Sequence, residues 1–277
     1  MAKLLEGKPL AEKIKQEIKQ AVQSLCVKPV LASVMVGEDA AADVYVKSQE
    51  RIAKDLGINY QLHKLAADTS EKKLVELIKE LNSDKSVSGI IIQMPLPKGV
   101  DYKKIRDCVS SAKDVEGISP LNLGMIMLGK AKLVPCVASA VMELLNSTGI
   151  DLSGKEVVLV GWTDIVGKPL AVLLSEKLAT VTICQIKVKN IEEFVRRAEV
   201  LIVAVGKAGL IKGNWIKKDA VVIDVGINRV DGKIVGDVEF EGAERLASYI
   251  TPVPGGVGPL TVMMLMRNLV EAAKLQQ

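Results

Sequence analysis

The sequence predicts an α/β protein with parallel sheets and two domains. Short apolar runs, typical of buried strands, alternate along the chain with segments of amphipathic helical spacing. This alternation is typical of βαβ units, in which helices connect parallel strands. The length of 277 residues is the second observation behind the prediction, because it is sufficient for two domains of ordinary size.

Each element is assigned from its hydrophobic pattern. Apolar residues three or four apart mark one face of a helix, whereas short continuous apolar runs mark buried strands. The predicted helices span residues 9–26, 43–56, 70–81, 138–146, 166–177 and 257–274. The predicted strands span residues 30–36, 60–65, 89–93, 156–160, 180–184, 200–205 and 220–225.

The chain changes character in residues 114–128, where an acidic turn leads into a connector that contains Gly and Met. We place the domain change there, with one domain in residues 1–118 plus 258–277 and the other in residues 119–257. The closely spaced strands of the second domain predict a Rossmann-type nucleotide-binding domain. The last helix is expected to return to the first domain, with the ligand cleft between the two.

Composition excludes several classes of function. The chain is 49% hydrophobic and 25% charged, as in globular proteins, and its net charge of +4 mildly favours an anionic ligand. Only 3% of residues are aromatic, which argues against nucleic-acid stacking surfaces. No apolar run is long enough to span a bilayer, and the N-terminus lacks a signal peptide. We expect a cytoplasmic protein without nucleic-acid or membrane partners.

Metal and disulfide sites are not expected. The four cysteines are not paired in Cys-x-x-Cys motifs, and His63 is the only histidine. Cys184 lies in an apolar run and is interpreted as a core residue. His63 alternates with apolar neighbours and is interpreted as a strand residue.

Residues 250–261 contain three glycines and three prolines directly before an apolar helix. Proline restricts φ, and glycine allows a ligand to approach the backbone closely. We therefore consider two interpretations, a shaped ligand wall and a rigid turn between domains. The candidate binding residues in this segment are Pro254, Gly255, Gly256 and Pro259.

The predicted strand 156–160 runs into Gly161, Trp162 and Thr163 before a helix. A helix N-terminus offers unpaired N–H groups to a dinucleotide phosphate, although the Gly-x5-Gly spacing is a weak motif and Asp164 would repel that phosphate. The next strand ends without the acidic residue that binds an NAD ribose, whereas Lys187 or Lys189 can meet a 2′-phosphate. NADP is therefore favoured over NAD, unless both lysines are simply solvated.

Three polar residues in the first domain are further candidates. Gln93 ends an apolar strand, where ligands of parallel sheets bind. Tyr45 and Gln49 are four residues apart, so both lie on one face of the predicted helix. Alone, the Tyr45 and Gln49 pair is also compatible with an ordinary helix surface.

Several ordered motifs resemble those of the methylenetetrahydrofolate dehydrogenase/cyclohydrolase family, and the similarity covers essentially the whole chain. The matching motifs are Val36-Gly-Glu-Asp-Ala, Tyr45-Val-Lys-Ser, Ile92-Gln-Met-Pro-Leu-Pro97, Lys113-Asp-Val-Glu-Gly117, Ile165-Val-Gly-Lys-Pro169, Asp224-Val-Gly-Ile-Asn228, Gly236-Asp-Val238 and Thr251-Pro-Val-Pro-Gly-Gly-Val-Gly-Pro259.

The resemblance implies a homodimer that oxidises 5,10-methylenetetrahydrofolate with NADP and hydrolyses the methenyl product to 10-formyltetrahydrofolate. In the family, a tyrosine matching Tyr45 packs on the folate, and a lysine at position 49 polarises the reacting centre. The glutamine matching Gln93 orients that lysine, and an aspartate at position 116 contacts the pterin. The loop matching residues 254–259 borders the folate.

This chain departs from the family at two of the catalytic positions. Gln49 stands at the lysine position, and an amide carries no charge and exchanges no proton near neutral pH. Glu116 keeps the carboxylate of the usual aspartate but moves it by one methylene. On the cofactor side, Trp162 and Ile186 replace the usual arginine and serine, while the remaining candidate contacts are Gly161, Thr163, Lys187 and Ile227.

Three hypotheses follow from these departures. The first is the full bifunctional enzyme with NADP. The second is a dehydrogenase with weak or absent cyclohydrolase activity. Hydrolysis needs a side chain that exchanges a proton, which Gln49 does not supply, whereas hydride transfer depends mainly on the positioning of the two reactants. The third is a non-catalytic paralogue that binds folate or a nucleotide.

Overall fold

The computed structural model describes residues 1–277, apart from the side chain of Ala41. Its internal contacts separate the chain into two units, which we describe one at a time. Unit 1 comprises Met1–Glu12 and Pro135–Met264, and unit 2 comprises Lys13–Val134 and Leu265–Gln277. Two helices contribute residues to both units, namely α1 (Gly7–Gln23) and α10 (Val257–Leu275).

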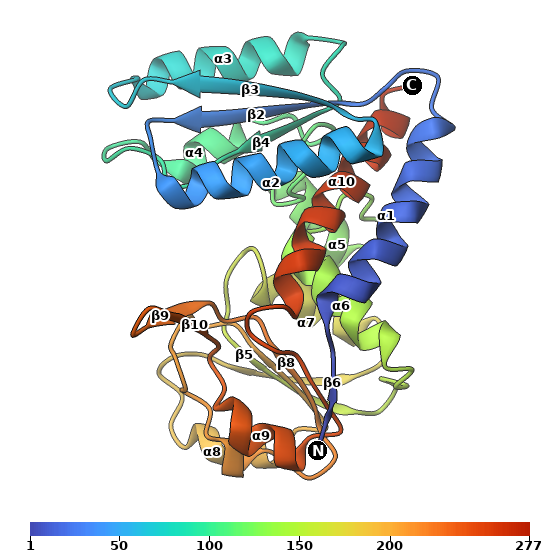
Figure 1. Ribbon diagram of the computed structural model, residues 1–277, viewed down its shortest axis with the longest axis vertical. Helices are drawn as coiled ribbons and strands as arrows, with labels where there is room; N and C mark the ends of the chain where they lie inside the picture. The colour runs from blue at the N-terminus through green and yellow to red at the C-terminus, as the bar shows by residue number, and fades with distance from the viewer. The chain divides into compact units, whose positions relative to one another are not determined.

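Unit 2 contains a three-stranded parallel sheet in the order β3-β2-β4 (Figure 1). Its strands are β2 (Val30–Val36), β3 (Asn59–Leu65) and β4 (Gly89–Ile92). The helices between and after them are α2 (Ala40–Leu56), α3 (Glu71–Ser83), α4 (Tyr102–Asp107) and α5 (Pro120–Met127). Every residue of β2 is buried, as expected for the central strand of a parallel sheet.

The two faces of this sheet are covered by different helices, and α2 and α3 lie on opposite sides (Figure 1). On one face, Ala32 and Val34 of β2 pack with Ile78 of α3. On the other, Met35 packs with Val46 of α2. Because side chains alternate along a strand, Ser33 points to the α2 face like Met35. The sequence thus places a hydroxyl beneath a helix that also carries Gln49.

A polar turn follows the sheet of unit 2 and is held from two sides. The carboxylate of Asp114 accepts hydrogen bonds from the backbone N–H of Gly117 (3.0 Å) and of Ser119 (2.7 Å). The amide Nδ2 of Asn268, on α10, donates to the carbonyls of Val115 and Val134, each at 2.8 Å. These bonds fix the backbone on both sides of Glu116.

Unit 1 contains a six-stranded parallel sheet in the order β1-β11-β8-β7-β5-β6. Its strands are β1 (Lys3–Leu4), β5 (Glu156–Val160), β6 (Thr180–Cys184), β7 (Val200–Val203), β8 (Val221–Asp224) and β11 (Tyr249–Ile250). The remaining elements are α6 (Cys136–Ser147), α7 (Gly167–Ser175), α8 (Ile191–Arg197), η1 (Gly213–Trp215), α9 (Phe240–Leu246) and an antiparallel hairpin of β9 (Asn228–Val230) and β10 (Lys233–Val235).

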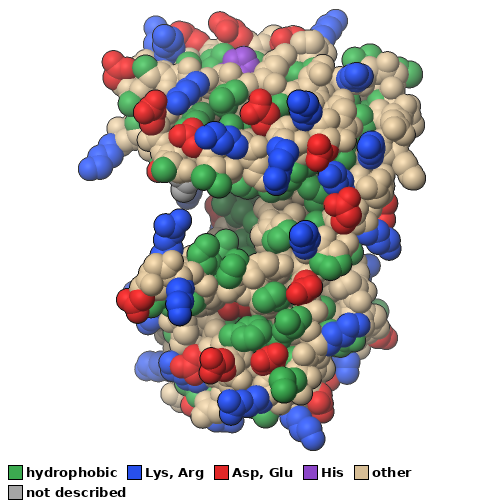
Figure 2. Space-filling view, viewed as in Figure 1, with side chains coloured by type: hydrophobic (Ala, Val, Ile, Leu, Met, Phe, Trp, Pro, Cys, Tyr) green, Lys and Arg blue, Asp and Glu red, His purple; other side chains and the backbone are tan. Residues whose placement is uncertain are grey.

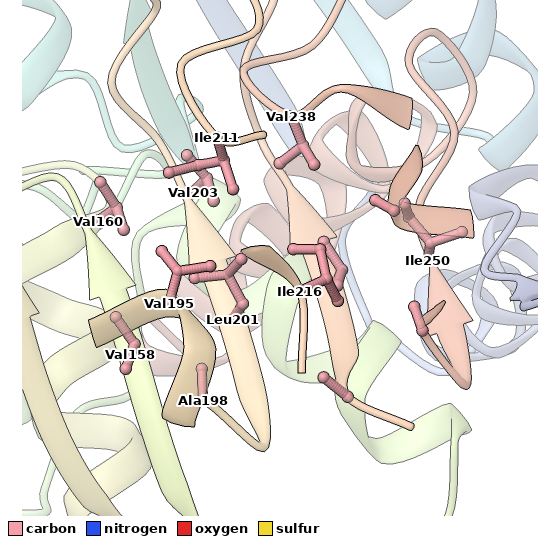
Figure 3. Packing of buried hydrophobic residues seen from close by; sticks show 14 of the residues in the cluster. Val158, Val160, Val195, Ala198, Leu201, Val203, Ile211, Ile216, Val238 and Ile250 are labelled. Atoms are coloured by element: carbon pink, nitrogen blue, oxygen red, sulfur yellow. The ribbon is translucent and has the colours of Figure 1, made fainter. Parts of the chain in front are cut away.

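The core of unit 1 on one sheet face is aliphatic. Figure 3 shows Val158, Leu201 and Val203 of the central strands packed with Val195 of α8 and with Ile216. Cys184 belongs to the same buried cluster, which confirms its interpretation as a core residue. Burial raises the pKa of its thiol, so the thiol stays protonated at neutral pH.

The predicted elements all form, and their ends differ from the predicted ones by at most three residues. The sequence pattern missed the short elements α4, α5, α8, α9, β1, β11 and the β9–β10 hairpin. These segments are too short to show a periodic apolar face, and their positions depend on contacts with distant parts of the chain. His63 lies in β3, as expected.

The surface carries both signs of charge. Basic and acidic side chains are interspersed on the face shown in Figure 2, in agreement with the small net charge of +4. Within the described residues, no helix combines the length and apolarity needed to cross a membrane.

We predict that Asn268→Leu lowers the free energy of unfolding by about 2–4 kcal/mol, because one buried and one partly buried carbonyl lose their donor. Urea denaturation followed by circular dichroism measures the change. Gln20→Leu, at an exposed position of α1, is the matched control and should shift stability by less than about 0.5 kcal/mol. Equal stability of the two variants would contradict the role given to Asn268.

Candidate active site

Gln49 and Gln93 meet in a buried polar cluster of unit 2. Gln93 is the first residue after β4, and its backbone N–H donates to the carbonyl of Val34 (2.8 Å). Its amide Nε2 donates to Oε1 of Gln49 (2.9 Å) and to Oγ of Ser33 (2.9 Å). The hydroxyl of Tyr60, on β3, also donates to Oε1 of Gln49 (3.1 Å). Two candidates that are 44 residues apart in sequence are therefore in direct contact.

The cluster is uncharged. Gln49 is 0% exposed and Ser33 is equally buried. Burial raises the pKa of Tyr60 to about 12, so its hydroxyl remains protonated and neutral at physiological pH. Lys47, two residues before Gln49 on the same helix, is exposed, and two residues correspond to about 200° of rotation around a helix. The side chains that surround Gln49 supply hydrogen bonds and no positive charge.

Tyr45 lies one helical turn before Gln49 on α2 and retains 36% of its surface exposed. An aromatic ring with this exposure on the helix face that carries Gln49 is available to a planar ligand. The structure thus combines an accessible ring with a buried amide on the same side of α2.

Glu116 lies in the turn held by Asp114. The residue as a whole is partly exposed, yet the protein atoms packed around its carboxyl and the nearby charge of Asp114 raise the pKa of Glu116 to about 8. At neutral pH the side chain is therefore mostly a protonated acid, which donates as well as accepts hydrogen bonds. A carboxyl group with a shifted pKa at an accessible position is typical of functional sites.

In unit 1, the sheet order creates a switch point between β5 and β7. From β5 the chain passes to β6 on one side and then crosses to β7 on the other. Ligands of open parallel sheets bind beyond the carboxyl ends of the strands at such a point. Gly161 follows β5 with a φ of 120°, and an added Cβ there would overlap the carbonyl oxygen of Ala204 after β7. Only glycine allows these two loops to approach so closely.

The remaining cofactor candidates lie along this edge of the sheet. Trp162 after β5 is 38% exposed, Ile186 after β6 is 78% exposed, and Ile227 after β8 is 68% exposed. Apolar side chains left exposed beside backbone N–H groups suit a nucleotide, which has flat rings and phosphates.

Two further candidates of the loop after β5 shape its backbone. The hydroxyl of Thr163 accepts a hydrogen bond from the N–H of Val166 (3.2 Å). The carboxylate of Asp164 pairs with Lys168 one turn later, which reduces the repulsion that Asp164 would exert on a phosphate. Lys187 is exposed after β6, where its ammonium group is accessible to a ligand.

Two buried aspartates that the sequence motifs contained, but to which no role was assigned, organise the same edge. The carboxylate of Asp237 accepts hydrogen bonds from the N–H groups of Val205, Gly206 and Lys207 at 2.8–2.9 Å. Asp224 likewise accepts from three N–H groups, including that of Asp237 (3.0 Å). Each aspartate lies at or just after the end of a strand, which was the signal available in the sequence. Which N–H groups the two carboxylates bind depends on the tertiary structure.

The Pro- and Gly-rich segment forms a tight loop in unit 1 before α10. The N–H of Gly256 donates to the carbonyl of Pro252 (2.8 Å), and the N–H of Gly7 donates to Gly255 (2.8 Å). An added Cβ at Gly7 would overlap the carbonyl oxygen of Gly256, so the start of α1 requires glycine. Pro254, which follows a cis peptide bond, and Pro259 complete the segment.

Among the described residues, no set of three or more His, Cys, Asp or Glu side chains is arranged to hold a metal ion.

Comparison with protein families gives matches to two domain models. The catalytic domain of tetrahydrofolate dehydrogenase/cyclohydrolase matches residues 5–116, and the NAD(P)-binding domain of the same family matches residues 135–277. The chain belongs to the tetrahydrofolate dehydrogenase/cyclohydrolase family.

Individual members of the tetrahydrofolate dehydrogenase/cyclohydrolase family are similar over their whole length. The bifunctional protein FolD of Acetivibrio thermocellus is 50% identical and covers 99% of this chain and 98% of its own. The crystal structure of the bifunctional FolD from Campylobacter jejuni superposes with a TM-score of 0.97 at 42% identity, covering 100% of both chains. The FolD of Trypanosoma brucei, crystallised with NADP cofactor and inhibitor, gives a TM-score of 0.93 at 34% identity, covering 99% and 98%.

We predict that Asp237→Asn lowers the free energy of unfolding of unit 1 by about 2–4 kcal/mol, because an amide has a single acceptor oxygen for several buried donors. Urea denaturation measures the effect. Asp231→Asn in the exposed turn between β9 and β10 removes the same charge and serves as the control. If both substitutions have the same small effect, Asp237 does not hold the loop after β7.

Proposed function

We propose that this chain oxidises 5,10-methylenetetrahydrofolate to 5,10-methenyltetrahydrofolate with NADP and hydrolyses the methenyl product to 10-formyltetrahydrofolate. The observation that carries the proposal is family membership over both domains, with relatives that are bifunctional over the full length. In the first step a hydride passes from the methylene carbon to NADP⁺. In the second, water adds to the methenyl carbon, the bond from that carbon to N5 breaks so that a formyl group remains on N10, and a proton is released. The chain thus acts in one-carbon metabolism.

The candidate folate-binding residues are in unit 2 and in the Pro- and Gly-rich loop. We propose that the exposed ring of Tyr45 packs on the folate and that the Gln49–Gln93 pair faces the reacting centre. Glu116 is proposed to contact the pterin. Pro254, Gly255, Gly256 and Pro259 are proposed as further folate contacts, because a loop rich in glycine offers backbone with little side chain in the way.

The carboxyl edge of the unit 1 sheet fits NADP, which supplies the hydride acceptor when bound. Gly161 permits close approach of the phosphates, and Thr163 stabilises the loop that surrounds them. Trp162, Ile186 and Ile227 offer apolar surface for the rings. Lys187 is the proposed partner of the 2′-phosphate, since the end of β6 lacks the acidic residue that an NAD ribose prefers.

A second candidate function is a dehydrogenase with weak cyclohydrolase activity. The specific observation is the neutral environment of Gln49, whose contacts are Tyr60 and Gln93. An amide orients a substrate but does not exchange a proton near neutral pH, so hydride transfer is less affected than hydrolysis. This candidate keeps the same substrate and cofactor.

The test is a paired assay of the purified protein with 5,10-methylenetetrahydrofolate and either NADP⁺ or NAD⁺. Reduced nucleotide and methenyl product are recorded separately. The bifunctional enzyme is supported if reduced nucleotide forms and the methenyl product is lost faster than by spontaneous hydrolysis. The dehydrogenase without cyclohydrolase is supported if the methenyl product accumulates. If neither product forms with either cofactor, the protein is a binding paralogue and both proposals fail.

We predict that Gln49→Lys raises the ratio of cyclohydrolase to dehydrogenase activity by at least about tenfold, because an ammonium group restores an exchangeable proton. Steady-state rates with 5,10-methenyl- and 5,10-methylenetetrahydrofolate give the ratio. Gln61→Lys, which adds a lysine at an exposed position of β3, is the control. An unchanged ratio would show that position 49 is not the lysine position of the family.

The raised pKa of Glu116 predicts a pH-dependent affinity. Below about pH 8 the carboxyl is neutral, and above it the ionised form accepts hydrogen bonds from pterin N–H groups more strongly. The KM for 5,10-methylenetetrahydrofolate should therefore fall by up to about tenfold between pH 7 and pH 9. Glu116→Gln should abolish this dependence, whereas Glu241→Gln at an exposed position should keep it. A wild-type profile without this change would exclude the contact.

We also propose that the chain works as a homodimer in the cytoplasm, with residues 1–118 plus 258–277 for folate and 119–257 for NADP. The family resemblance supports this organisation. Sedimentation equilibrium should give twice the 29.8 kDa mass of the chain, and a single-chain mass would contradict the dimer.

A further inference from the structure

One polar atom of the Gln49 cluster lacks a partner. Among the buried side-chain nitrogen and oxygen atoms of the described residues, Nε2 of Gln49 and Nε2 of His63 have no hydrogen-bond partner in the protein. Gln49 is 0% exposed, so solvent does not compensate its amide as it would on the surface. Buried donors are almost always satisfied in folded proteins, so an unpaired donor in a candidate site calls for an explanation, and the acceptor of a bound ligand supplies one.

The orientation of the Gln49 amide follows from its other contacts. Its Oε1 accepts from the hydroxyl of Tyr60 and from Nε2 of Gln93, which uses both lone pairs of the oxygen. Gln93 is in turn fixed by Oγ of Ser33. With the oxygen held by two donors, Nε2 of Gln49 is directed away from them.

Tyr60 was not identified from the sequence, because none of the family motifs covers β3. Its position follows from strand register, because Tyr60 pairs with Leu31 in the sheet and therefore shares a face with Ser33 two residues later. The same face is covered by α2, where Tyr60 packs against the cluster of Met35, Ala42 and Val46. The ring is anchored by packing, and its hydroxyl reaches Gln49.

We propose that Nε2 of Gln49 donates a hydrogen bond to an acceptor of the bound reduced pterin, and that Tyr60 is the positioning residue which orients this amide. The proposal rests on the proposed folate site. In this proposal Gln49 is a neutral donor. Its amide donates a hydrogen bond to a lone pair of the substrate and transfers no proton during the reaction. Tyr60 acts through Gln49 and not on the substrate itself.

The experiment measures tetrahydrofolate affinity by isothermal titration calorimetry in the wild type, Tyr60→Phe, Gln49→Ala and the double variant. Removing the Tyr60 hydroxyl should weaken binding about threefold to tenfold, as expected for one lost neutral hydrogen bond. In the Gln49→Ala background the same removal should have no further effect, since Tyr60 acts through Gln49. Additive losses in the double variant would overturn the positioning role.

Two controls separate this role from a structural one. Thermal unfolding should place Tyr60→Phe within a few degrees of the wild type, while Tyr249→Phe in unit 1 removes another tyrosine hydroxyl and should leave affinity unchanged. Gln49→Glu, which presents only acceptors when ionised, should lose affinity. Full affinity in Gln49→Glu would mean that an oxygen faces the substrate and would overturn the donor assignment.

Binding and turnover distinguish this proposal from the proposed function. If the wild type binds tetrahydrofolate but forms no reduced nucleotide, the enzymatic function fails while the affinities still test Gln49 and Tyr60. If the wild type turns over substrate and Tyr60→Phe binds equally well, only the positioning role fails. A wild type that does not bind tetrahydrofolate overturns both.

Discussion

Parallel strand pairing places the carboxyl ends of neighbouring strands at one edge of a sheet, and both candidate sites depend on this constraint. In unit 1 it brings the loops after β5 and β7 together, where Gly161 and Ala204 are in contact. In unit 2 it brings Gln93, at the end of β4, beside the central strand β2. Residues that are far apart in the chain become neighbours because their strands end at the same level.

Buried polar side chains then hold the loops that leave these edges. An unpaired polar group in the interior costs free energy, so each of these side chains stabilises the fold only where its hydrogen-bond partners are present. Asp237 satisfies three N–H groups after β7, and Asp114 satisfies the turn that carries Glu116. The unpaired Nε2 of Gln49 is an exception to this rule, and it lies in the candidate catalytic cluster.

The neutral environment of Gln49 is the feature on which the proposed balance between the two reactions of the family rests. Hydride transfer requires two partners to be held at the correct distance, which hydrogen bonds and packing supply. Hydrolysis also requires a group that exchanges a proton, and a cluster of Ser33, Tyr60 and Gln93 around Gln49 offers none near neutral pH. Activity ratios rather than total activity therefore report on this site.

The sequence by itself determined the α/β class, the long elements and the candidates Gln93 and Gly161, because hydrophobic periodicity and the residues that end a strand are local properties. Comparison with the family motifs identified Gln49 and Glu116 as departures from the residues usual in the family, again from the sequence alone. Only the tertiary structure decided the shifted pKa of Glu116, the Asp237 contacts and the hydrogen bond from Tyr60 to Gln49. Each of these depends on burial or on strand register, and both arise from contacts between segments that no local pattern connects.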